Sequence, residues 1–426
     1  MTPQMKEKIE KLQRGEVPAG YRSTEIGILP DNWQCKELRE ICEPITQVAG
    51  TDEFETLSIS AGLGFVNQAE KFGKELSGKQ YEKYKVLHKG DFSYNKGNSS
   101  KYPQGCIYRL KDRENAAVPN VFESFRLKQQ YCADYYDQLF TSGFLNRQLV
   151  RKINHGIRDD GLLNLTEKDF YSCLLPVPPI DEQKSIAVIL NTHDDIIALY
   201  RQKTEQLLQL KKTCLSKLFP KKESTFPEIR FPGFTKPWEQ CNVSDITTSY
   251  SGGTPQASNS EYYNGEIPFI RSGEINGDHT ELFITQKGMD NSSAKMVSKG
   301  DILYALYGAT SGEVSRAGLD GAINQAILAI IPKKNNNTDF LVEWFRKEKN
   351  NIIDKYLQGG QGNLSAQIIK NLEITIPSFD EQNIIGQYFS GLNTLITLHQ
   401  RMIEELQQEK RTLFKLLLMG ISISSS

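Results

Sequence analysis

The sequence contains no run of about eighteen apolar residues, so we expect no segment of it to span a membrane. Its first stretch, Met1 to Arg14, is charged and polar and lacks the apolar core of a secretory signal. These two absences exclude the membrane and secreted classes. We therefore expect the protein to stay in the cytoplasm.

Spacings that bind metals are also missing. No two of the seven cysteines lie closer than Cys35 and Cys42, so the sequence has no CxxC pair. An odd number of scattered cysteines is typical of reduced thiols that pack as small hydrophobic residues. We predict no metal site. The cysteines are Cys35, Cys42, Cys106, Cys132, Cys173, Cys214 and Cys241.

Neither sign of charge is in excess, because the formal net charge is −1. A DNA-binding protein that acts alone through its overall field needs a visible cationic excess to neutralise phosphates. Any contact with DNA must therefore come from local patches or be shared with a partner protein.

Signatures of catalysis are absent or incomplete. Gly73 to Lys79 is close to a phosphate-binding loop, but Gln80 stands where a hydroxyl would hold Mg²⁺, and we interpret the segment as a surface turn. Glu182-Gln-Lys184 has the acid-x-Lys spacing of nucleases, yet the matching site in the second half reads Glu381-Gln-Asn383. The five histidines are dispersed, and no Asn-Pro-Pro-aromatic motif of adenine methyltransferases is present. We predict no catalytic residue.

The strongest positive signal is an internal repeat. The segment Leu175 to Gln183, LPVPPIDEQ, returns as Thr375 to Gln382, TIPSFDEQ, with an offset of 199 residues between Asp181 and Asp380. Further pairs recur at similar offsets, and these are Trp33 with Trp238, Lys89-Gly-Asp91 with Lys299-Gly-Asp301, and Asn164 with Asn363. The chain is therefore expected to consist of two similar halves.

A long helical pattern follows each Asp-Glu-Gln, with apolar positions spaced alternately by four and three residues, as in a heptad seam. No Pro or Gly lies between Glu182 and Phe219, which predicts a helix of roughly 55 to 60 Å. Lys211 and Lys410 occupy the same seam position in the two copies. The predicted seam residues are Ile186, Leu190, Ile197, Leu207 and Leu218 in the first helix, and Ile385, Phe389, Ile396, Leu406 and Leu417 in the second.

The helix starts and interruptions carry expectations of their own. Asp181 and Asp380 each follow a proline-containing approach and are expected to be N-caps. Gly386 and Gly391 weaken the second helix by about 1 kcal/mol each, which implies support from packing. Seams of this kind must be buried, and two matching helices bury them against each other.

The halves before the helices have short β-rich runs, which predict an α+β fold with two globular domains and a pseudo-twofold internal repeat. We expect a first domain at residues 1–175, a first spacer helix at 176–222, a second domain at 223–375 and a second spacer helix at 376–426. Parallel helices would bring the domains side by side. Antiparallel helices would hold them at opposite ends of a rod.

Contact with DNA requires cations for phosphates, and amide or guanidinium groups for base edges. Polar loops and a stretch without acids supply such groups in the first half, namely Asn95, Lys96, Asn98, Ser99, Lys101, Arg151, Lys152, His155 and Arg158. In the second half the candidates are Gly253, Thr254, Arg271, Ser272, Tyr307, Thr310, Ser311, Gln361 and Asn363. Most clusters of Gly, Ser and Thr are simple turns, so each loop also has a structural interpretation.

In combination these motifs resemble the specificity subunit of Type I restriction-modification enzymes. The likeness spans essentially the whole chain. The motifs that carry it are Val17 to Gly27, the two Asp-Glu-Gln units with their helices, Ser251-Gly-Gly-Thr-Pro255, Lys299 to Tyr304 (KGDILY) and Tyr307 to Gly312 (YGATSG).

The resemblance implies two target-recognition domains separated by two long antiparallel coiled-coil helices. Each domain would read one part of a split target in double-stranded DNA, and the helices would act as a ruler and dock two modification (methyltransferase) subunits. Restriction and translocase subunits would complete the assembly. The chain itself would hold no cofactor, because S-adenosylmethionine, ATP and Mg²⁺ would belong to the partner subunits. The two recognition halves differ strongly, which predicts an asymmetric target.

Two other functions remain open at this stage. The chain could be a coiled-coil scaffold whose globular halves bind proteins, or an enzyme acting alone. Footprinting with the modification partner distinguishes the scaffold, which would protect no defined DNA sequence. Methylation or cleavage by the isolated chain would establish the enzyme, and the missing motifs argue against it.

Overall fold

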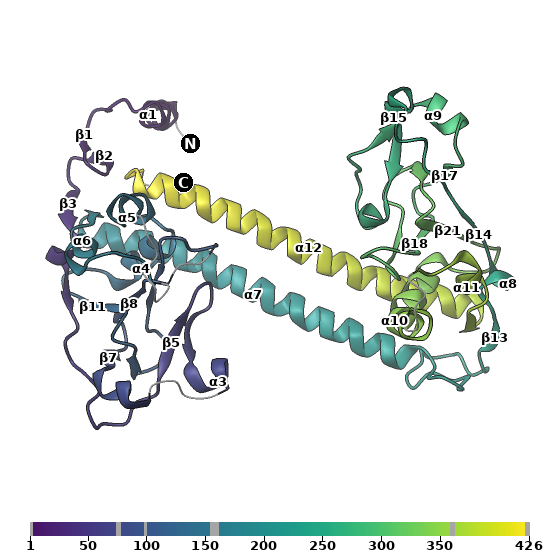
Figure 1. Ribbon diagram of the computed structural model, residues 1–426, viewed down its shortest axis with the longest axis horizontal. Coiled ribbons are helices and arrows are strands. Elements are labelled where there is room, and N and C mark those ends of the chain that lie inside the picture. The colour runs from purple at the N-terminus through teal and green to yellow at the C-terminus, as the bar shows by residue number, and fades with distance from the viewer. Residues whose placement is uncertain (1–2, 74–77, 98–99, 154–161, 358–362, 422–426) are drawn as a thin grey trace. The chain divides into compact units, whose positions relative to one another are not determined.

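The computed structural model describes residues 3–73, 78–97, 100–153, 162–357 and 363–421. The chain divides into two compact units, Met1–Leu199 with Ile403–Ser426 (unit 1) and Tyr200–Met402 (unit 2). Two long helices, α7 (Ile180–Leu218) and α12 (Phe379–Leu418), contribute residues to both units. Figure 1 shows them as the teal and yellow ribbons.

Unit 1 is built on a four-stranded antiparallel sheet in the order β4-β11-β8-β9. Its strands are β4 (Cys42–Pro44), β11 (Glu123–Leu127), β8 (Phe92–Asn95) and β9 (Cys106–Arg109). We call this sheet, together with the helices beside it, the frame of the unit. Its helices are α2 (Leu38–Ile41), α4 (Ala133–Thr141), α5 (Asn146–Lys152) and α6 (Glu167–Tyr171). Strand β3 (Gln34–Glu37) pairs with β12 (Leu174–Val177) directly before α7.

The remaining elements of unit 1 surround this frame. Two further strand pairs are β5 (Leu57–Ser60) with β6 (Gly64–Asn67) and β7 (Lys85–His88) with β10 (Asn115–Val118), next to α3 (Gln68–Phe72) and the 3₁₀ helix η1 (Gly78–Lys83). At the N-terminal side lie α1 (Pro3–Gln13) and the hairpin of β1 (Tyr21–Thr24) and β2 (Gly27–Pro30).

Unit 2 repeats the frame with the sheet order β14-β21-β18-β19. Its strands are β14 (Thr247–Ser251), β21 (Ile327–Pro332), β18 (Ile302–Ala305) and β19 (Val314–Arg316). Strand β13 (Glu239–Asn242) pairs with β22 (Glu373–Ile376) directly before α12, as β3 and β12 do before α7. The helices of this frame are α8 (Val243–Ile246), α10 (Thr338–Tyr356) and α11 (Ala366–Lys370).

Unit 2 differs from unit 1 in a second four-stranded sheet, with the order β16-β15-β20-β17. Its strands are β16 (Phe283–Ile284), β15 (Tyr263–Ile270), β20 (Gly321–Ile323) and β17 (Lys295–Val297). Around it lie α9 (Gln286–Asp290) and the 3₁₀ helices η2 (Ser260–Tyr262) and η3 (Ser272–Glu274). The two units therefore share a frame and differ in what is attached to it.

The repeated Asp-Glu-Gln motif makes the same hydrogen bonds in both units. Gln183 accepts from the backbone N–H of Cys132 at 3.0 Å and donates to the carbonyl of Pro178 at 2.8 Å. Gln382 accepts from the backbone N–H of Asn337 at 3.0 Å and donates to Pro377 at 3.0 Å. This buried glutamine therefore joins the start of each long helix to the N-cap residue of α4 or α10.

The Lys-Gly-Asp repeat is a turn that leads into a central strand. Asp91 accepts a hydrogen bond from the backbone N–H of His88 at 2.7 Å, and Asp301 accepts one from Ser298 at 2.8 Å. The glycine of each turn has a φ near +100°, 98° at Gly90 and 99° at Gly300, a conformation that favours glycine. The motif is therefore a feature of the fold.

Eight of the ten predicted seam residues are buried, and Leu207 and Leu406 are half-buried. In unit 1, Leu417 near the end of α12 shares a core with Ile186 near the start of α7. In unit 2, Phe389 near the start of α12 lies 6.1 Å, ring to ring, from Phe219, which directly follows α7. The helix segments of each unit are thus antiparallel, as the family resemblance implies.

Two details of the helices differ from expectation. Each helix begins one residue earlier than its aspartate, so Asp181 and Asp380 lie in the first turn, and the expectation that they are N-caps is wrong. There they face the positive end of the helix dipole. A Cβ on Gly386 would lie 2.4 Å from Asn337 Oδ1, so packing requires this glycine, whereas Gly391 has open space.

Candidate nucleic-acid interface

In unit 2, several candidate residues of the second half lie in loops at one edge of the frame sheet. Neighbouring strands are antiparallel, so the end of β14 at Ser251 and the end of β18 at Ala305 lie at the same edge as the starts of β21 and β19. Strands β15 and β20 are parallel and pair Ile270 with Ile323. Arg271 therefore leaves β15 beside Asn324, which leads into the start of β21.

The glycine pair at this edge is held by close packing. A Cβ on Gly252 would lie 1.8 Å from the carbonyl oxygen of Ile323, and one on Gly253 would lie 2.0 Å from Ser293 Oγ. The structure thus gives these glycines a packing role, whatever their backbone amides bind. The next residue, Thr254, is exposed and donates to Gln325 Oε1 at 2.7 Å.

Gln325 is a candidate that sequence reasoning missed. Its side chain is exposed at the loop edge, and a glutamine amide can donate to and accept from a base edge. In the sequence it stands directly before the buried strand β21, and only the fold places it beside Thr254.

Arg271 lies between two carboxylates. Its Nη2 donates to Glu274 Oε1 at 2.6 Å and to Glu281 Oε2 at 3.0 Å. Burial raises the pKa of Glu274, but hydrogen bonds from the side chain and backbone of Arg271 outweigh it and lower that pKa to about 2. The guanidinium is therefore already neutralised, while its neighbour Ser272 is half-buried in η3.

The loop after β18 lies beside the segment that enters α11. The backbone N–H of Leu364 donates to the carbonyl of Leu306 at 2.9 Å, which places Asn363 near Tyr307. Ser311 Oγ donates to the carbonyl of Gly308 at 2.9 Å and closes a turn that includes Thr310. A hollow of about 470 Å³ next to Asn363 is lined also by Tyr356, Ser365, Gln367, Ile368 and Asn371. Gln361 lies outside the described residues.

The corresponding edge of unit 1 holds the loop after β8. Asn95 donates to the carbonyl of Ile59 at 3.1 Å and accepts from the backbone N–H of Gly97 at 2.8 Å, so its amide orders the loop. Lys96 is paired with Glu123 at 2.5 Å and is largely buried. Lys101 is exposed. Asn98 and Ser99 lie outside the described residues.

Helix α5 supplies exposed cations in unit 1. Arg151 is exposed and has no side-chain partner within the described part of the chain, and Arg147 one turn earlier is also exposed. Lys152 donates to Ser172 Oγ at 2.7 Å and is therefore engaged with α6. His155 and Arg158 lie outside the described residues.

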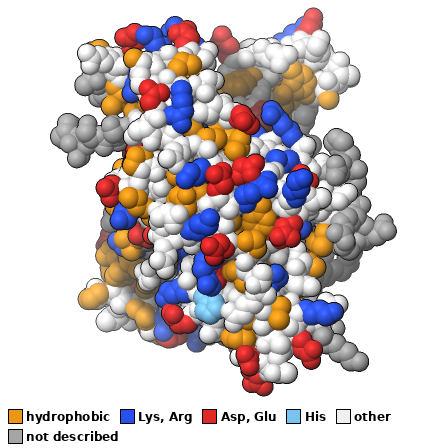
Figure 2. Space-filling view, turned by 90° about the vertical axis from the view of Figure 1, so that its left-hand side faces the viewer, with side chains coloured by type: hydrophobic (Ala, Val, Ile, Leu, Met, Phe, Trp, Pro, Cys, Tyr) orange, Lys and Arg blue, Asp and Glu red, His pale blue; other side chains and the backbone are white. Residues whose placement is uncertain are grey.

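Charged side chains of both signs lie on one side of unit 1. Figure 2 shows basic and acidic side chains interspersed on the side of unit 1 that faces the viewer. A broad cationic surface is not seen on this side. Exposed cations of unit 1 include Lys101, Arg147 and Arg151.

Metal and thiol chemistry have little support in the described ranges. Among them no group of three or more His, Cys, Asp or Glu residues is placed to hold a metal ion. Burial raises the pKa of the Cys173 thiol to about 11 and that of Cys42 to about 12, so both stay protonated near neutral pH. Nor does any helix in the described ranges have the length and apolarity needed to cross a membrane.

The long helices also leave apolar side chains exposed. In unit 2, α7 exposes Leu208 by 48% and Leu210 by 43%, and α12 exposes Leu395 by 45% and Leu398 by 51%. These leucines lie outside the predicted seam and are exposed to solvent.

Comparisons with known proteins agree on one family. Residues 30–209 and 235–408 each match the family described as the Type I restriction modification DNA specificity domain. A Methanocaldococcus jannaschii protein named as the specificity subunit of the type I restriction enzyme MjaX is 23% identical over 94% of this chain and 96% of its own length.

Solved structures show the same fold. The crystal structure of the type I restriction-modification S subunit from M. genitalium has a TM-score of 0.61 at 14% identity, covering 91% of this chain and 96% of that one. A chain from a study of assembly and conformational transition in a type I restriction-modification system has a TM-score of 0.53 at 19% identity, covering 92% and 99%.

Proposed function

The chain belongs to the Type I restriction modification DNA specificity domain family, and we propose that it gives one restriction-modification complex its DNA sequence specificity. The observation that carries this proposal is the double family match, at residues 30–209 and 235–408, over a frame that the structure repeats. In each unit the frame sheet presents a loop edge with amide, hydroxyl or cationic side chains, the groups that contact bases and phosphates.

The target would be bipartite and asymmetric. The frames of the two units have equivalent strand orders, whereas unit 2 carries the β15-β20 sheet and unit 1 carries the strand pairs β5-β6 and β7-β10. Different loops on equivalent frames read different sequences, so each unit would recognise its own half of the target.

The helix pair would set the gap between the half-sites and bind two modification subunits. Both helices are continuous, with 39 residues in α7 and 40 in α12, and a rigid spacer admits only a set distance and phase along DNA. The exposed leucines of the helices, such as Leu208 and Leu395, suit an apolar partner surface. Removing one heptad from both helices should shorten the accepted gap by about three base pairs without changing either half-site.

The chemistry of modification and cleavage would lie in the partner subunits. They would bind S-adenosylmethionine, ATP and Mg²⁺, and this chain would contribute no catalytic group. Restriction and translocase subunits would join the same assembly on double-stranded DNA.

Footprinting of the chain in complex with its modification subunits tests the proposal. We expect two protected segments of defined sequence, separated by an unread gap. A scaffold that binds only proteins would protect no defined sequence, and that outcome would reject DNA reading by this chain.

A further inference from the structure

Each long helix places a lysine at the same seam position, and the two lysines meet different partners. In unit 1, Lys410 of α12 lies 2.6 Å from Asp194 Oδ1 of α7. Gln138 of α4 donates to the other oxygen of Asp194 at 2.7 Å and also contacts Asn191 Oδ1 at 2.7 Å. This cluster therefore joins both long helices to α4 through one carboxylate and one bridging amide.

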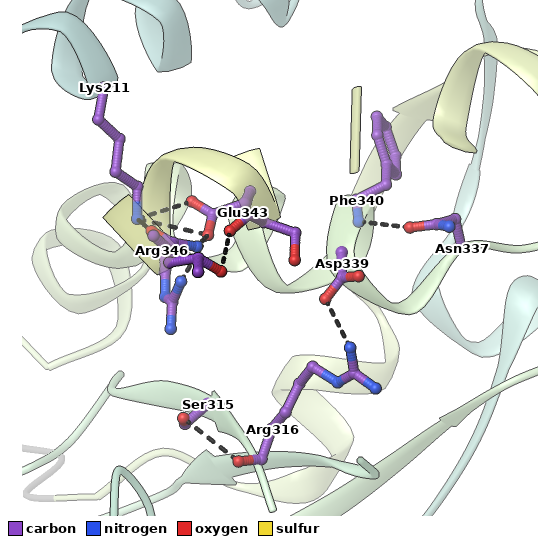
Figure 3. A network of polar contacts seen from close by, with 11 residues as sticks. Lys211, Ser315, Arg316, Asn337, Asp339, Phe340, Glu343 and Arg346 are labelled. Carbon is purple, nitrogen blue, oxygen red and sulfur yellow. Dashed lines mark hydrogen bonds and ion pairs between the residues drawn. The ribbon is translucent and has the colours of Figure 1, made fainter. Parts of the chain in front are cut away.

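In unit 2, Lys211 of α7 occupies the corresponding place (Figure 3). Its Nζ lies 2.7 Å from Asn393 Oδ1 of α12 and 3.2 Å from Glu343 Oε2 of α10. Asn393 in turn donates to Glu343 Oε1 at 2.8 Å, and Arg346 also pairs with Glu343. This cluster joins the helices to α10 through the same kinds of group.

The long-helix positions of the two clusters are equivalent. Gln183 and Gln382 make the same hydrogen bonds, which fixes an offset of 199 residues between α7 and α12. Asp194 and Asn393 are related by this same offset. The carboxylate of unit 1 thus stands where unit 2 has an amide.

The positions on the domain helices are equivalent as well. Cys132 and Asn337 donate their backbone N–H groups to the equivalent glutamines, which aligns α4 with α10 at an offset of 205 residues. Gln138 and Glu343 are related by this offset. The amide of unit 1 therefore stands where unit 2 has a carboxylate, so the two groups have exchanged places.

We propose that residues 138 and 343 match each recognition domain to its own portion of the helix pair. A domain with an amide at this position requires aspartate on the facing helix, and a domain with a carboxylate requires asparagine. Either combination gives the lysine one carboxylate and leaves the amide N–H paired. Exchanging the two domains without their helices would leave one lysine without a carboxylate and give the other lysine two.

In unit 2 the charged groups of Glu343 and Lys211 are both largely buried, so a mismatch between positions 343 and 393 should be costly. The Glu343 side chain is 2% exposed and that of Lys211 is 16% exposed. Burial lowers the pKa of Lys211, and Glu343 opposes that effect, so the carboxylate helps to keep the lysine charged. A buried charge that loses its counter-ion strongly destabilises a fold.

A double-mutant cycle in the full chain tests the inference. Glu343→Gln alone should lower the thermal midpoint of unfolding by roughly 5–10 °C, because Lys211 and Arg346 lose their shared carboxylate. Asn393→Asp alone should also lower it, because two carboxylates then face each other. In the double variant an amide at position 343 faces a carboxylate at position 393, as Gln138 faces Asp194 in unit 1. Adding Glu343→Gln to Asn393→Asp should therefore raise the midpoint.

Matched controls use exposed residues of the same unit. Glu373→Gln and Asn371→Asp make the same chemical changes at the surface and should shift the midpoint by no more than about 1–2 °C, singly or together. Hydrogen exchange of peptides from α10 assigns the effect to unit 2. The inference is overturned if Glu343→Gln lowers the midpoint equally with and without Asn393→Asp.

The mirror cycle in unit 1 keeps the inference testable if the unit 2 variants do not fold. Asp194 is 46% exposed, so Gln138→Glu and Asp194→Asn should each be tolerated with a smaller loss of stability. The pair Gln138→Glu with Asp194→Asn should recover the protection of α4 amides. Strictly additive losses in this cycle would also contradict the matching of the two positions.

Discussion

Arg230 holds the carboxylate of Glu381 with two hydrogen bonds of 2.7 Å, from Nε to Oε1 and from Nη2 to Oε2. Glu381 is 1% exposed and follows the aspartate of the second Asp-Glu-Gln motif. The equivalent Glu182 of unit 1 accepts instead from Trp33 Nε1 at 2.9 Å. The counterpart of Trp33 in unit 2 is Trp238, whose buried Nε1 has no hydrogen-bond partner among the described residues. The same glutamate therefore takes a different partner in each unit.

Removing the guanidinium should destabilise the protein more than removing the indole N–H. Arg230→Ala leaves a buried carboxylate unpaired and should lower the free energy of unfolding by about 3–5 kcal/mol. Trp33→Phe removes the hydrogen bond to Glu182, which is half-buried, and should lower the free energy of unfolding by about 1.5–3 kcal/mol. Urea unfolding measures both. Arg316→Ala, which breaks the more exposed pair with Asp339, is the control and should change it by at most about 1 kcal/mol. An equal effect of Arg230→Ala and Arg316→Ala would contradict the role given to Arg230.

The two glycines of α12 should respond to alanine in opposite directions. Gly391→Ala adds a methyl group in open space and should raise the free energy of unfolding by about 1 kcal/mol through helix propensity. Gly386→Ala places its Cβ against Asn337, whose Oδ1 accepts from Phe340 N at 2.9 Å at the start of α10, and should lower it. Thermal unfolding of the two variants measures both changes in stability. Stabilisation by Gly386→Ala would show that α10 does not pack closely on α12.

The two long helices and the repeated halves could be predicted from the sequence, because they follow from periodicity and repetition. The seam from Ile186 to Leu218 and its copy from Ile385 to Leu417 have the spacing of a buried helix face, and eight of the ten predicted residues are buried. The repeated Asp-Glu-Gln marked the start of each helix to within one residue. The hydrogen bonds of Gln183 were not predictable, because its partner Cys132 is 51 residues away and carries no motif.

The candidate interface was harder to predict from the sequence. A glycine that faces a phosphate and a glycine that packs against backbone look alike in sequence, and only the structure shows Gly252 against Ile323. Likewise, the loop with Lys96 is polar in sequence, yet Glu123 from β11 neutralises this lysine. Gln325 was overlooked because an isolated amide before an apolar strand carries no pattern. Contact of the predicted residues with DNA stays a prediction.

Acid should weaken the fold partly through Glu274. The pKa of this carboxyl is lowered from 4.5 to about 2 in the folded protein, so its ionised form is favoured by folding. The stability it contributes is complete above about pH 4.5 and is lost as the pH falls toward 2. Urea unfolding between these values should show a smaller loss for Glu274→Gln than for the natural chain. The exposed Glu266→Gln is the control, and identical acid profiles for all three proteins would contradict the assignment.

Amide and cation variants should separate base reading from phosphate binding. Gln325→Ala should lower discrimination at one position of one half-site, by about 1–3 kcal/mol, and leave the salt dependence of binding unchanged. Arg151→Ala should weaken binding to all sequences alike and reduce the slope of log K against log salt by about one. Both are measured with the chain in complex with its modification subunits. A sequence-specific effect of Arg151→Ala would reverse the role given to this residue.

Each unit should read one half of the target independently, on a common frame. The most direct measurement replaces residues 34–177, from the start of β3 to the end of β12, with the first domain of another family member. The donor should carry glutamine at the position of Gln138, so that the contact with Asp194 is kept. Methylated adenines in cells that contain the exchanged complex are then mapped by sequencing. One half-site should change while the other half-site and the gap persist, and a change in both half-sites would contradict independent reading by the two units.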